Sequence, residues 1–165
     1  MTETAFTPGP ATERALRTAL GRFATGITVV TCQGPAGPLG LTANSFAAVS
    51  LDPALVLWSP ARASRRHDAF VAAGHYAIHV LGEDQHALCR AFVRPEGWFP
   101  DLGHSLSPEG VPLLPGCLAR FECARTATYP AGDHTIVVGR VLRACYREGA
   151  PLIFSGGLYG RFAGI

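Results

Sequence analysis

The chain has 165 residues and a formal net charge of +2, with 48% hydrophobic residues and only 16% charged residues. This length favours a single domain over 1–165, in which 1–11 form a flexible tail. The small net charge excludes the broad basic surface that nucleic acid binding requires. The apolar composition predicts that part of the surface is covered by a second copy, in a homodimer.

Residues 1–11 lack the basic start and the apolar core of a secretory signal, so we expect a cytoplasmic protein. The run 23–51 contains no charged residue and no histidine, and it is long enough to cross a bilayer. Glycine and proline interrupt it repeatedly at 34–40, so it is interpreted as strands, with no membrane span. The five cysteines have no Cys-x-x-Cys spacing and are expected to be free thiols.

The first third of the chain predicts a helix followed by a hairpin. Apolar residues at helical spacing indicate an amphipathic helix over 12–24, with Thr12 as its N-cap. Ile27–Cys32 is rich in β-branched residues and predicts a strand. A glycine- and proline-rich turn at 33–38 leads to a second strand from Leu39.

The middle of the chain adds strands and a short helix. Phe46–Leu51 and Leu55–Ser59 predict two strands joined by a turn at Asp52-Pro53. Ser64 is expected to cap a helix that ends at Gly74. Tyr76–Leu81 then predicts another strand.

The last part is dominated by two long strands, Leu118–Tyr129 and Thr135–Tyr146, and by a short one at Leu152–Ser155. Before them, Gln85–Phe92 fits a short helix, and 93–116 holds five prolines in an irregular stretch typical of a functional or interface loop. Many strands with few short helices favour a mainly β, closed architecture over βαβ winding.

Three polar side chains, Thr42, Asn44 and Ser45, stand between apolar runs that predict buried strands. Buried polar groups need partners, so these side chains either bind something polar that the fold encloses or satisfy a tight bend between two strands. The residues themselves leave both interpretations open.

Five stretches together resemble the flavin reductase-like family. They are Thr25–Thr31, Gly40–Phe46, Ser50–Pro53, Gly132–Ile136 and Gly156–Tyr159. Members of that family are FMN-binding split β-barrels that supply reduced flavin to two-component monooxygenases. The resemblance covers roughly Ala15 to Phe162. It implies a split β-barrel that uses FMN or FAD, takes NADH or NADPH as co-substrate, and has a monooxygenase as its partner.

The stretch Arg62-Ala63-Ser64-Arg65-Arg66-His67 is the clearest candidate for an anion site. Arginines at the start of a predicted helix supply bidentate donors for a phosphate, although a solvated basic patch would have the same sequence. The resemblance implies that this stretch binds the flavin phosphate. Arg66 departs from the family pattern, since a small hydroxyl residue is common there.

Asp133 and His134 are a second pair of candidate functional residues. A turn aspartate and a histidine at a strand start explain the pair without catalysis, since no serine or cysteine nucleophile accompanies it. The resemblance implies that His134 lies near the flavin and orients the nicotinamide. Hydride passes directly between the two cofactors, so His134 need not transfer a proton.

The resemblance also assigns the remaining contacts. The cofactor-binding residues that it implies are Thr42, Ala43, Asn44, Ser45, Ser59, Ser64, Arg65, Arg66, Gly132, Asp133 and Tyr159. No metal site is expected, because His75 and His79 lie on a predicted strand, where residues four apart are well separated. His79 stands where the family usually has asparagine.

Two other classes of function remain open. One is a non-catalytic flavin- or haem-binding split barrel with a carrier or sensing role, and the other is an interaction protein without a ligand. The sequence leaves open the choice of FMN or FAD, that of NADH or NADPH, and whether flavin is a prosthetic group or a substrate.

Overall fold

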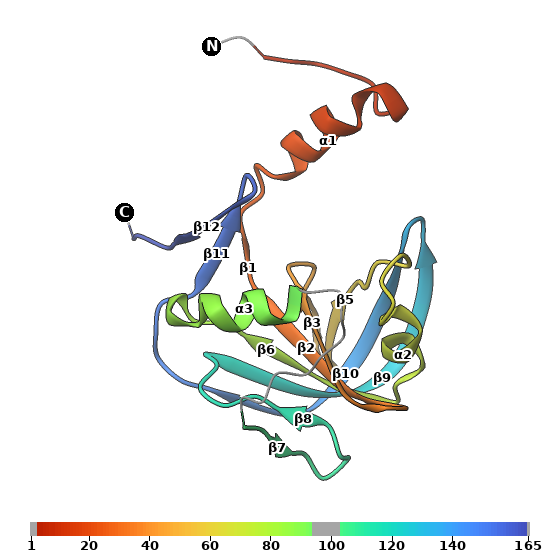
Figure 1. Ribbon diagram of the computed structural model, residues 1–165, viewed down its shortest axis with the longest axis vertical. Coiled ribbons are helices and arrows are strands. Elements are labelled where there is room, and N and C mark those ends of the chain that lie inside the picture. Colours follow the sequence, from red (N-terminus) through yellow and green to blue (C-terminus); the bar gives the residue numbers. More distant parts are fainter. Residues whose placement is uncertain (1–2, 94–102, 165) are drawn as a thin grey trace.

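The computed structural model describes residues 3–93 and 103–164, and strands dominate it (Figure 1). The helical elements are the 3-10 turns η1 (Pro10–Thr12) and η2 (Glu83–Gln85) and the helices α1 (Glu13–Leu20), α2 (His67–Ala72) and α3 (His86–Val93). The strands are β1 (Thr25–Gly26), β2 (Thr28–Gly34), β3 (Gly37–Ala43), β4 (Ala47–Leu51), β5 (Ala54–Trp58), β6 (His75–Val80), β7 (Ser105–Leu106), β8 (Pro112–Leu113), β9 (Ala119–Ala131), β10 (His134–Tyr146), β11 (Leu152–Ser155) and β12 (Leu158–Arg161).

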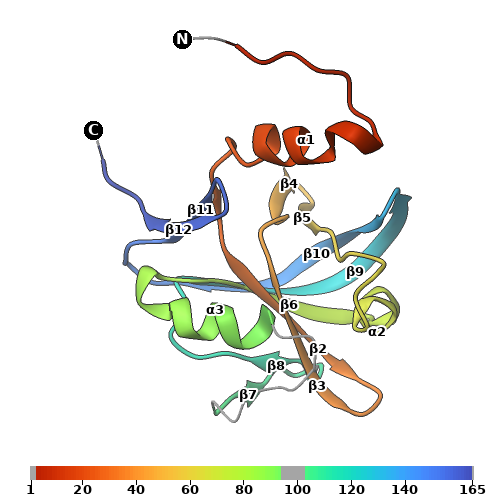
Figure 2. The same cartoon turned by 45° about the horizontal axis from the view of Figure 1, so that its top comes forward.

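The main sheet has seven antiparallel strands in the order β3-β2-β6-β9-β10-β5-β4. The sheet curls (Figure 2), and its two edge strands, β3 and β4, are consecutive in the chain. A small sheet with the order β1-β11-β12 lies at one end, and β7 pairs with β8. The predicted mainly β fold is confirmed, and β12 is a strand that the sequence analysis did not predict.

Strand β2 is buried on both faces, which explains its run of β-branched residues. Successive side chains of a strand point to opposite faces. Val30 therefore joins the core around Trp58 and Phe70, whereas Val29 joins a second cluster with Leu81. That second cluster includes α3, which lies across the outer face of the curled sheet (Figure 1).

The packing of α3 on β3 requires a glycine at position 40. A Cβ at this position would lie 2.2 Å from the ring of Phe92, which is closer than any side chain can approach. The absence of a side chain therefore lets the Phe92 ring lie directly on the strand. The glycine that begins the stretch Gly40–Phe46 thus has a packing role.

Two predicted helix caps are wrong. The Oγ1 of Thr12 donates to the carbonyls of Thr7 and Gly9 instead of capping α1. Ser64 lies before α2, which begins at His67, and its Oγ accepts a bond from the Arg66 amide at 3.3 Å. In both cases the hydroxyl stabilises the turn that precedes the helix, as serine and threonine commonly do.

Helix α1 stands apart from the rest of the molecule, above the end of the sheet (Figures 1 and 2). It is shorter than the predicted 12–24 helix, since the chain turns at Gly21 and pairs as β1 from Thr25. No residue of α1 is buried, although its sequence is amphipathic. Over the described residues, every helix is too short or too polar to span a membrane.

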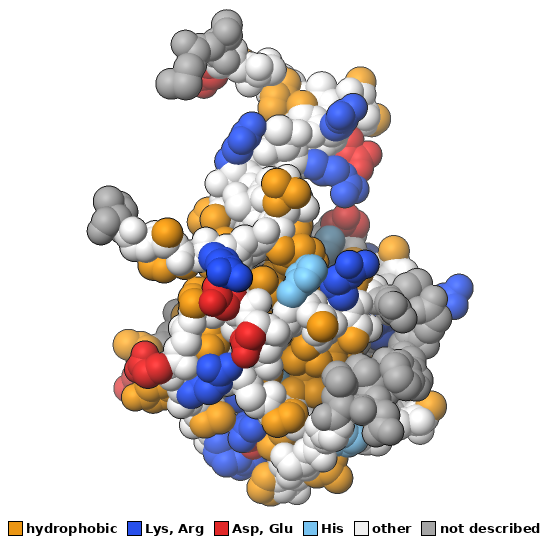
Figure 3. Space-filling view, turned by 60° about the vertical axis from the view of Figure 1, so that its left-hand side comes forward, with side chains coloured by type: hydrophobic (Ala, Val, Ile, Leu, Met, Phe, Trp, Pro, Cys, Tyr) orange, Lys and Arg blue, Asp and Glu red, His pale blue; other side chains and the backbone are white. Residues whose placement is uncertain are grey.

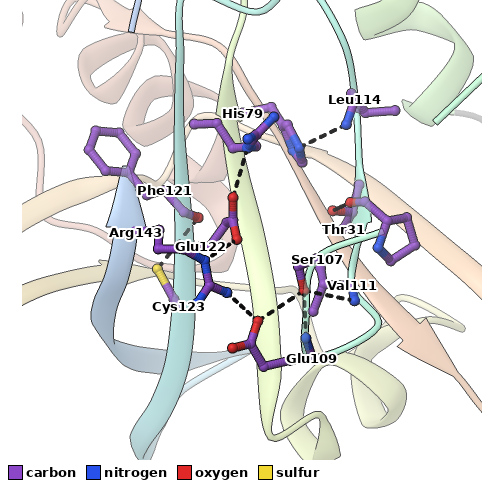
Figure 4. A network of polar contacts seen from close by, with 12 residues as sticks. Thr31, His79, Ser107, Glu109, Val111, Leu114, Phe121, Glu122, Cys123 and Arg143 are labelled. Atoms are coloured by element: carbon purple, nitrogen blue, oxygen red, sulfur yellow. Dashed lines mark hydrogen bonds and ion pairs between the residues drawn. The ribbon is translucent and has the colours of Figure 1, made fainter. Parts of the chain in front are cut away.

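Residues 104–114 are tied to the barrel by polar contacts (Figure 4). Arg143 on β10 donates to Glu122 at 2.7 Å and is also paired with Glu109. Hydrogen bonding to Arg143 holds the pKa of the Glu109 carboxyl below its usual value. Thr31 in β2 donates to the carbonyl of Pro112 at 2.6 Å. This part of the predicted irregular stretch is therefore anchored, and its remaining residues, 94–102, lie outside the described residues.

The five cysteines are all free thiols, as predicted. Cys32, Cys89 and Cys123 are buried, whereas Cys145 is exposed. Burial raises the pKa of Cys32 to about 12, because the thiolate would lose its hydration. The buried thiols therefore act as small apolar side chains.

Candidate active site

Three stretches singled out in the sequence lie side by side in the fold. The Oγ of Ser45 accepts a hydrogen bond from the Ser59 amide at 2.9 Å, which joins the β3–β4 connection to the end of β5. Two residues further on, Ala61 forms a β-bridge with His134 at the start of β10. The backbone thus brings 42–45, 59–66 and 132–134 together around one region.

Asn44 differs from its two polar neighbours. Thr42 donates to the carbonyl of Cys89 at 2.7 Å, and Ser45 is paired with Ser59, so both hydroxyls are satisfied by the protein. Asn44 is exposed, and its side chain has no hydrogen-bond partner among the described residues. The tight-bend interpretation thus explains two of the three side chains, and Asn44 is the one that is open to a ligand.

A small hollow lies beside β3, between this strand and the β11–β12 hairpin. Its lining is Ile27, Thr42, Ala43, Asn44, Phe154 and Tyr159. The hydroxyl of Tyr159 accepts a bond from the Cys89 thiol at 3.5 Å, and the tyrosine ring packs against His86 with centroids 4.7 Å apart. The Cys89 contact, with burial, raises the pKa of Tyr159 to about 12. Tyr159 is thus a neutral aromatic wall of this hollow.

A second hollow of about 540 Å³ contains the predicted phosphate stretch. Ser64, Arg65 and Arg66 all line it, together with Leu41 of β3. The two arginines differ in their surroundings. Arg65 is exposed, whereas Arg66 is only 7% exposed and its Nη1 donates to the carbonyls of Gly40 at 2.6 Å and Phe92 at 3.1 Å. Arg66 therefore connects α3 to β3, and Arg65 is the arginine whose charge faces solvent.

The anion site was expected at the start of a helix, but Ser64, Arg65 and Arg66 precede α2 instead of opening it. This helix has six residues and starts at His67, after the three residues that were expected to open it. The remaining donors of the stretch are the side chains of Ser64 and Arg65 and the backbone amides of the turn.

Gly132, Asp133 and His134 form the turn between β9 and β10. Gly132 has a φ of 63°, a conformation that favours glycine. The Nδ1 of His134 lies 2.8 Å from Asp133 Oδ1. This bond, then the charge of His134, and more weakly the charge of Arg17, lower the pKa of the Asp133 carboxyl. An ionised carboxylate only accepts, so Nδ1 carries the proton and Nε2 is the atom available to a ligand.

The largest cleft described, of about 810 Å³, contains both Asn44 and His134. Its other walls come from α1 and the turn after it, from β1 and from the turn that follows β11; they include Arg14, Arg17, Arg22, Thr25 and Gly156. The Oγ1 of Thr25 is buried without a hydrogen-bond partner in the described part of the chain. Sequence reasoning missed this wall, although Arg14, Arg17 and Arg22 all fall within the predicted 12–24 helix.

These surroundings fit a flavin. The hollow at Ala43 and Tyr159 offers apolar walls for a ring system, and the hollow at Ser64 and Arg65 offers cationic and hydroxyl donors for a phosphate. The end of β3 connects the two hollows, because Leu41 lines the phosphate hollow and Thr42 to Asn44 line the ring hollow. Within the described residues, no three or more His, Cys, Asp or Glu side chains are placed to hold a metal ion.

Comparison with known proteins gives the same picture. The model of the flavin reductase like domain matches residues 20–163. FMN reductase (NADH) SmoA of Agrobacterium fabrum is 58% identical over 161 residues, which cover 98% of this chain and 92% of that protein. The reductase component of the flavin-dependent trigonelline monooxygenase of Acinetobacter baylyi is 46% identical over 130 residues, 78% of this chain but only 42% of that protein.

A solved structure confirms the predicted fold class. The NADH:FAD oxidoreductase SgcE6 of Streptomyces globisporus, solved in complex with NAD and FAD fragments, superposes with a TM-score of 0.86. It is 39% identical, and the match covers 96% of this chain and 98% of that one.

Proposed function

Because the chain belongs to the flavin reductase-like family, we propose that it is an NADH-dependent flavin reductase that supplies reduced FMN or FAD to a partner monooxygenase. The observation that carries this proposal is the convergence of Asn44, Ser64 and His134 on adjoining hollows, joined through the Ala61–His134 bridge. A bound flavin would supply the acceptor for a hydride from reduced nicotinamide.

The residues of the chain would bind and orient the two nucleotides. Ser64 and Arg65 would hold the flavin phosphate, while Ala43 and Tyr159 would border the ring. The open amide of Asn44 lies at the boundary between the flavin hollow and the larger cleft, so it can reach either ligand. His134, held by Asp133, would set the position of the nicotinamide, and positioning of this kind lowers the barrier to transfer.

A direct assay tests the proposed activity. Purified protein mixed with NADH should oxidise it in the presence of FMN or FAD and release reduced flavin. Bound flavin in the absorption spectrum without NADH oxidation would favour a carrier or sensor instead. If the protein neither bound flavin nor oxidised NADH, the interaction protein would be the function class that remains.

The phosphate assignment predicts a selective effect of Arg65→Ala. Because Arg65 is exposed and free to contact a phosphate, its loss should weaken FMN binding by about 1.5–3 kcal/mol and leave riboflavin binding nearly unchanged. Titration of flavin fluorescence measures both affinities. Equal weakening of the two ligands would remove the phosphate assignment.

His134→Ala should separate binding from hydride transfer. Loss of its orienting contact should lower the rate of flavin reduction by NADH about tenfold or more, equivalent to about 1.4 kcal/mol for each factor of ten. Flavin affinity should change little. Stopped-flow reduction of the flavin-loaded variant measures the rate. A folded, flavin-bound variant with the wild-type rate would show that His134 only packs against the turn.

We also propose that the protein is a homodimer. Large apolar side chains are exposed outside the cleft of Asn44 and His134, including Leu51 at 96% exposure, Tyr146 at 85% and Leu158 at 74%. Groups of this kind on a monomer favour association. Light scattering at micromolar concentration should give the mass of a dimer, and Leu51→Glu should shift it toward the monomer. A monomeric wild-type mass would contradict the proposal.

The thiols support a cytoplasmic setting. All five cysteines are unpaired, including the exposed Cys145, which is typical of proteins from a reducing compartment.

A further inference from the structure

Helix α1 has a basic face directed at the cleft that holds His134. Residues at spacings of three, four, seven and eight share one side of a helix. Arg14, Arg17 and Thr18 share such a side of α1 and line the cleft, and Gly21 and Arg22 continue it in the turn that follows the helix. The apolar Leu20 and Phe23 also line the cleft. Leu16, which points to the opposite side, does not line it. Figure 3 shows basic side chains gathered on this outlying part of the molecule.

Most of the positive charge of these arginines is not neutralised by ion pairs within the described residues. Arg17 is paired with Glu13 at 2.8 Å, but the side chains of Arg14 and Arg22 have no ion-pair partner in the part of the chain that the structure describes. The charge of Arg17 also acts on Asp133 across the cleft, where it helps to keep that carboxyl ionised. The α1 face and the His134 wall therefore belong to one electrostatic environment.

The opposite wall of the cleft identifies the ligand class. His134 and Asn44 lie there, and the volume of about 810 Å³ is within the range that holds a small-molecule ligand. A ligand whose ring lies at His134 and whose remainder extends toward α1 would place its middle part beside three guanidinium groups. Guanidinium groups bind phosphate oxygens in bidentate fashion, so that middle part should be a diphosphate.

We propose that Arg14, Arg17 and Arg22 bind the diphosphate of the reduced nicotinamide dinucleotide while His134 positions its ring. This inference rests on the proposed reductase function and adds to it the element that recognises the co-substrate. It also gives α1 a function although the helix buries no residue of its own. The flavin phosphate is assigned to the separate hollow at Ser64 and Arg65, on the other side of the site.

The test compares a full co-substrate with one that lacks phosphate. NADH carries the diphosphate, whereas 1-benzyl-1,4-dihydronicotinamide has the same reactive ring and no phosphate. The variant Arg14→Gln/Arg22→Gln removes two charges and keeps side chains of similar size. Arg140→Gln is the matched control, because Arg140 is exposed on β10 and does not line the cleft. FMN is the acceptor in the main assays, so that NADH carries the only diphosphate, and a second set of assays replaces FMN with FAD.

The double variant should raise the KM for NADH about tenfold or more with kcat changed less than about twofold. Its rate with the benzyl analogue should equal that of the wild type, which also shows that the variant is folded. Added salt should raise the wild-type KM for NADH and affect the variant less. Arg140→Gln should behave as wild type.

Other outcomes would overturn the inference. An unchanged KM for NADH in the double variant would show that α1 does not bind the diphosphate, while leaving the reductase function intact. An effect seen only when FAD replaces FMN would assign the arginines to the diphosphate of the flavin. A wild-type protein that oxidises neither NADH nor the benzyl analogue would instead overturn the proposed function itself.

Discussion

Replacement of Arg66 by methionine is expected to destabilise the fold by about 2–5 kcal/mol, because it leaves two buried backbone acceptors without their donor. Arg66 is 93% buried by its neighbours, and its Nη1 donates to Gly40 on the edge strand β3 and to Phe92 in the last turn of α3. Carbonyls in the last turn of a helix have no partner within the helix, so the side chain supplies one. Methionine keeps most of the apolar stem and removes only the guanidinium.

Arg65→Met is the matched control for this variant. Arg65 adjoins Arg66 in the chain but is exposed, so its replacement should leave the free energy of unfolding within about 0.5 kcal/mol of wild type. Unfolding in guanidinium chloride without flavin measures both variants. If Arg66→Met were as stable as wild type and lost FMN affinity selectively, Arg66 would be the phosphate ligand that the sequence pattern predicts, and its packing role would be secondary.

Acid should weaken the fold through His79. This residue is fully buried on β6; its Nδ1 donates to the carbonyl of Val29 at 3.0 Å, and its Nε2 accepts from the amide of Leu114 at 3.1 Å (Figure 4). Protonation of Nε2 would break the second bond and place a charge in the core. Burial lowers the pKa of His79 to about 4; the Val29 carbonyl opposes this effect, and the charge of Arg120 adds to it.

The pH range of the effect follows from these pKa values. An unfolded histidine binds a proton below about pH 6.5, whereas His79 in the folded protein does so only near pH 4. The contribution of His79 is therefore complete above about pH 6.5 and is lost as the pH falls toward 4. The loss amounts to about 3 kcal/mol over this range.

His79→Asn tests this linkage. The free energy of unfolding should fall less steeply between pH 6.5 and 4.5 in the variant than in the wild type, even if the variant is less stable at pH 7.5. His75→Gln serves as the control, because His75 is exposed on the same strand. Parallel pH profiles for wild type and His79→Asn would show that another group is responsible for the acid sensitivity.

The strands could be predicted from the sequence because their signals are local. The β-branched run of β2 and the glycine- and proline-rich turns mark strand positions directly, and β9 and β10 match their predicted ranges within a few residues. The strand β12 was missed, since the glycines at 156 and 157 before it and at 160 within it indicate a loop. Its pairing with β11 stabilises an extended conformation that the local sequence does not favour.

The candidate site was only partly predictable, for a different reason. Asn44, Arg65 and His134 could be selected from short motifs, and each lines a hollow in the fold. The distinction between Arg65 and Arg66 depends on Gly40 and Phe92, both 26 residues away in the chain. The orientation of α1 toward His134 depends on contacts between residues still farther apart in the chain, which local patterns do not encode.

The position of β3 and β4 as the two edges of one sheet has a consequence for its motion. Each has a single ladder partner, β2 and β5 respectively, and 44–46 join them across the gap. Edges of this kind open locally at a lower free-energy cost than central strands. A flavin held by Ala43 at the end of β3 and by Ser64 and Arg65, which follow the β4 partner β5, would restrain this opening. Loading with FMN should therefore slow amide hydrogen exchange in β3 and β4 and leave exchange in the central strands β6 and β9 nearly unchanged.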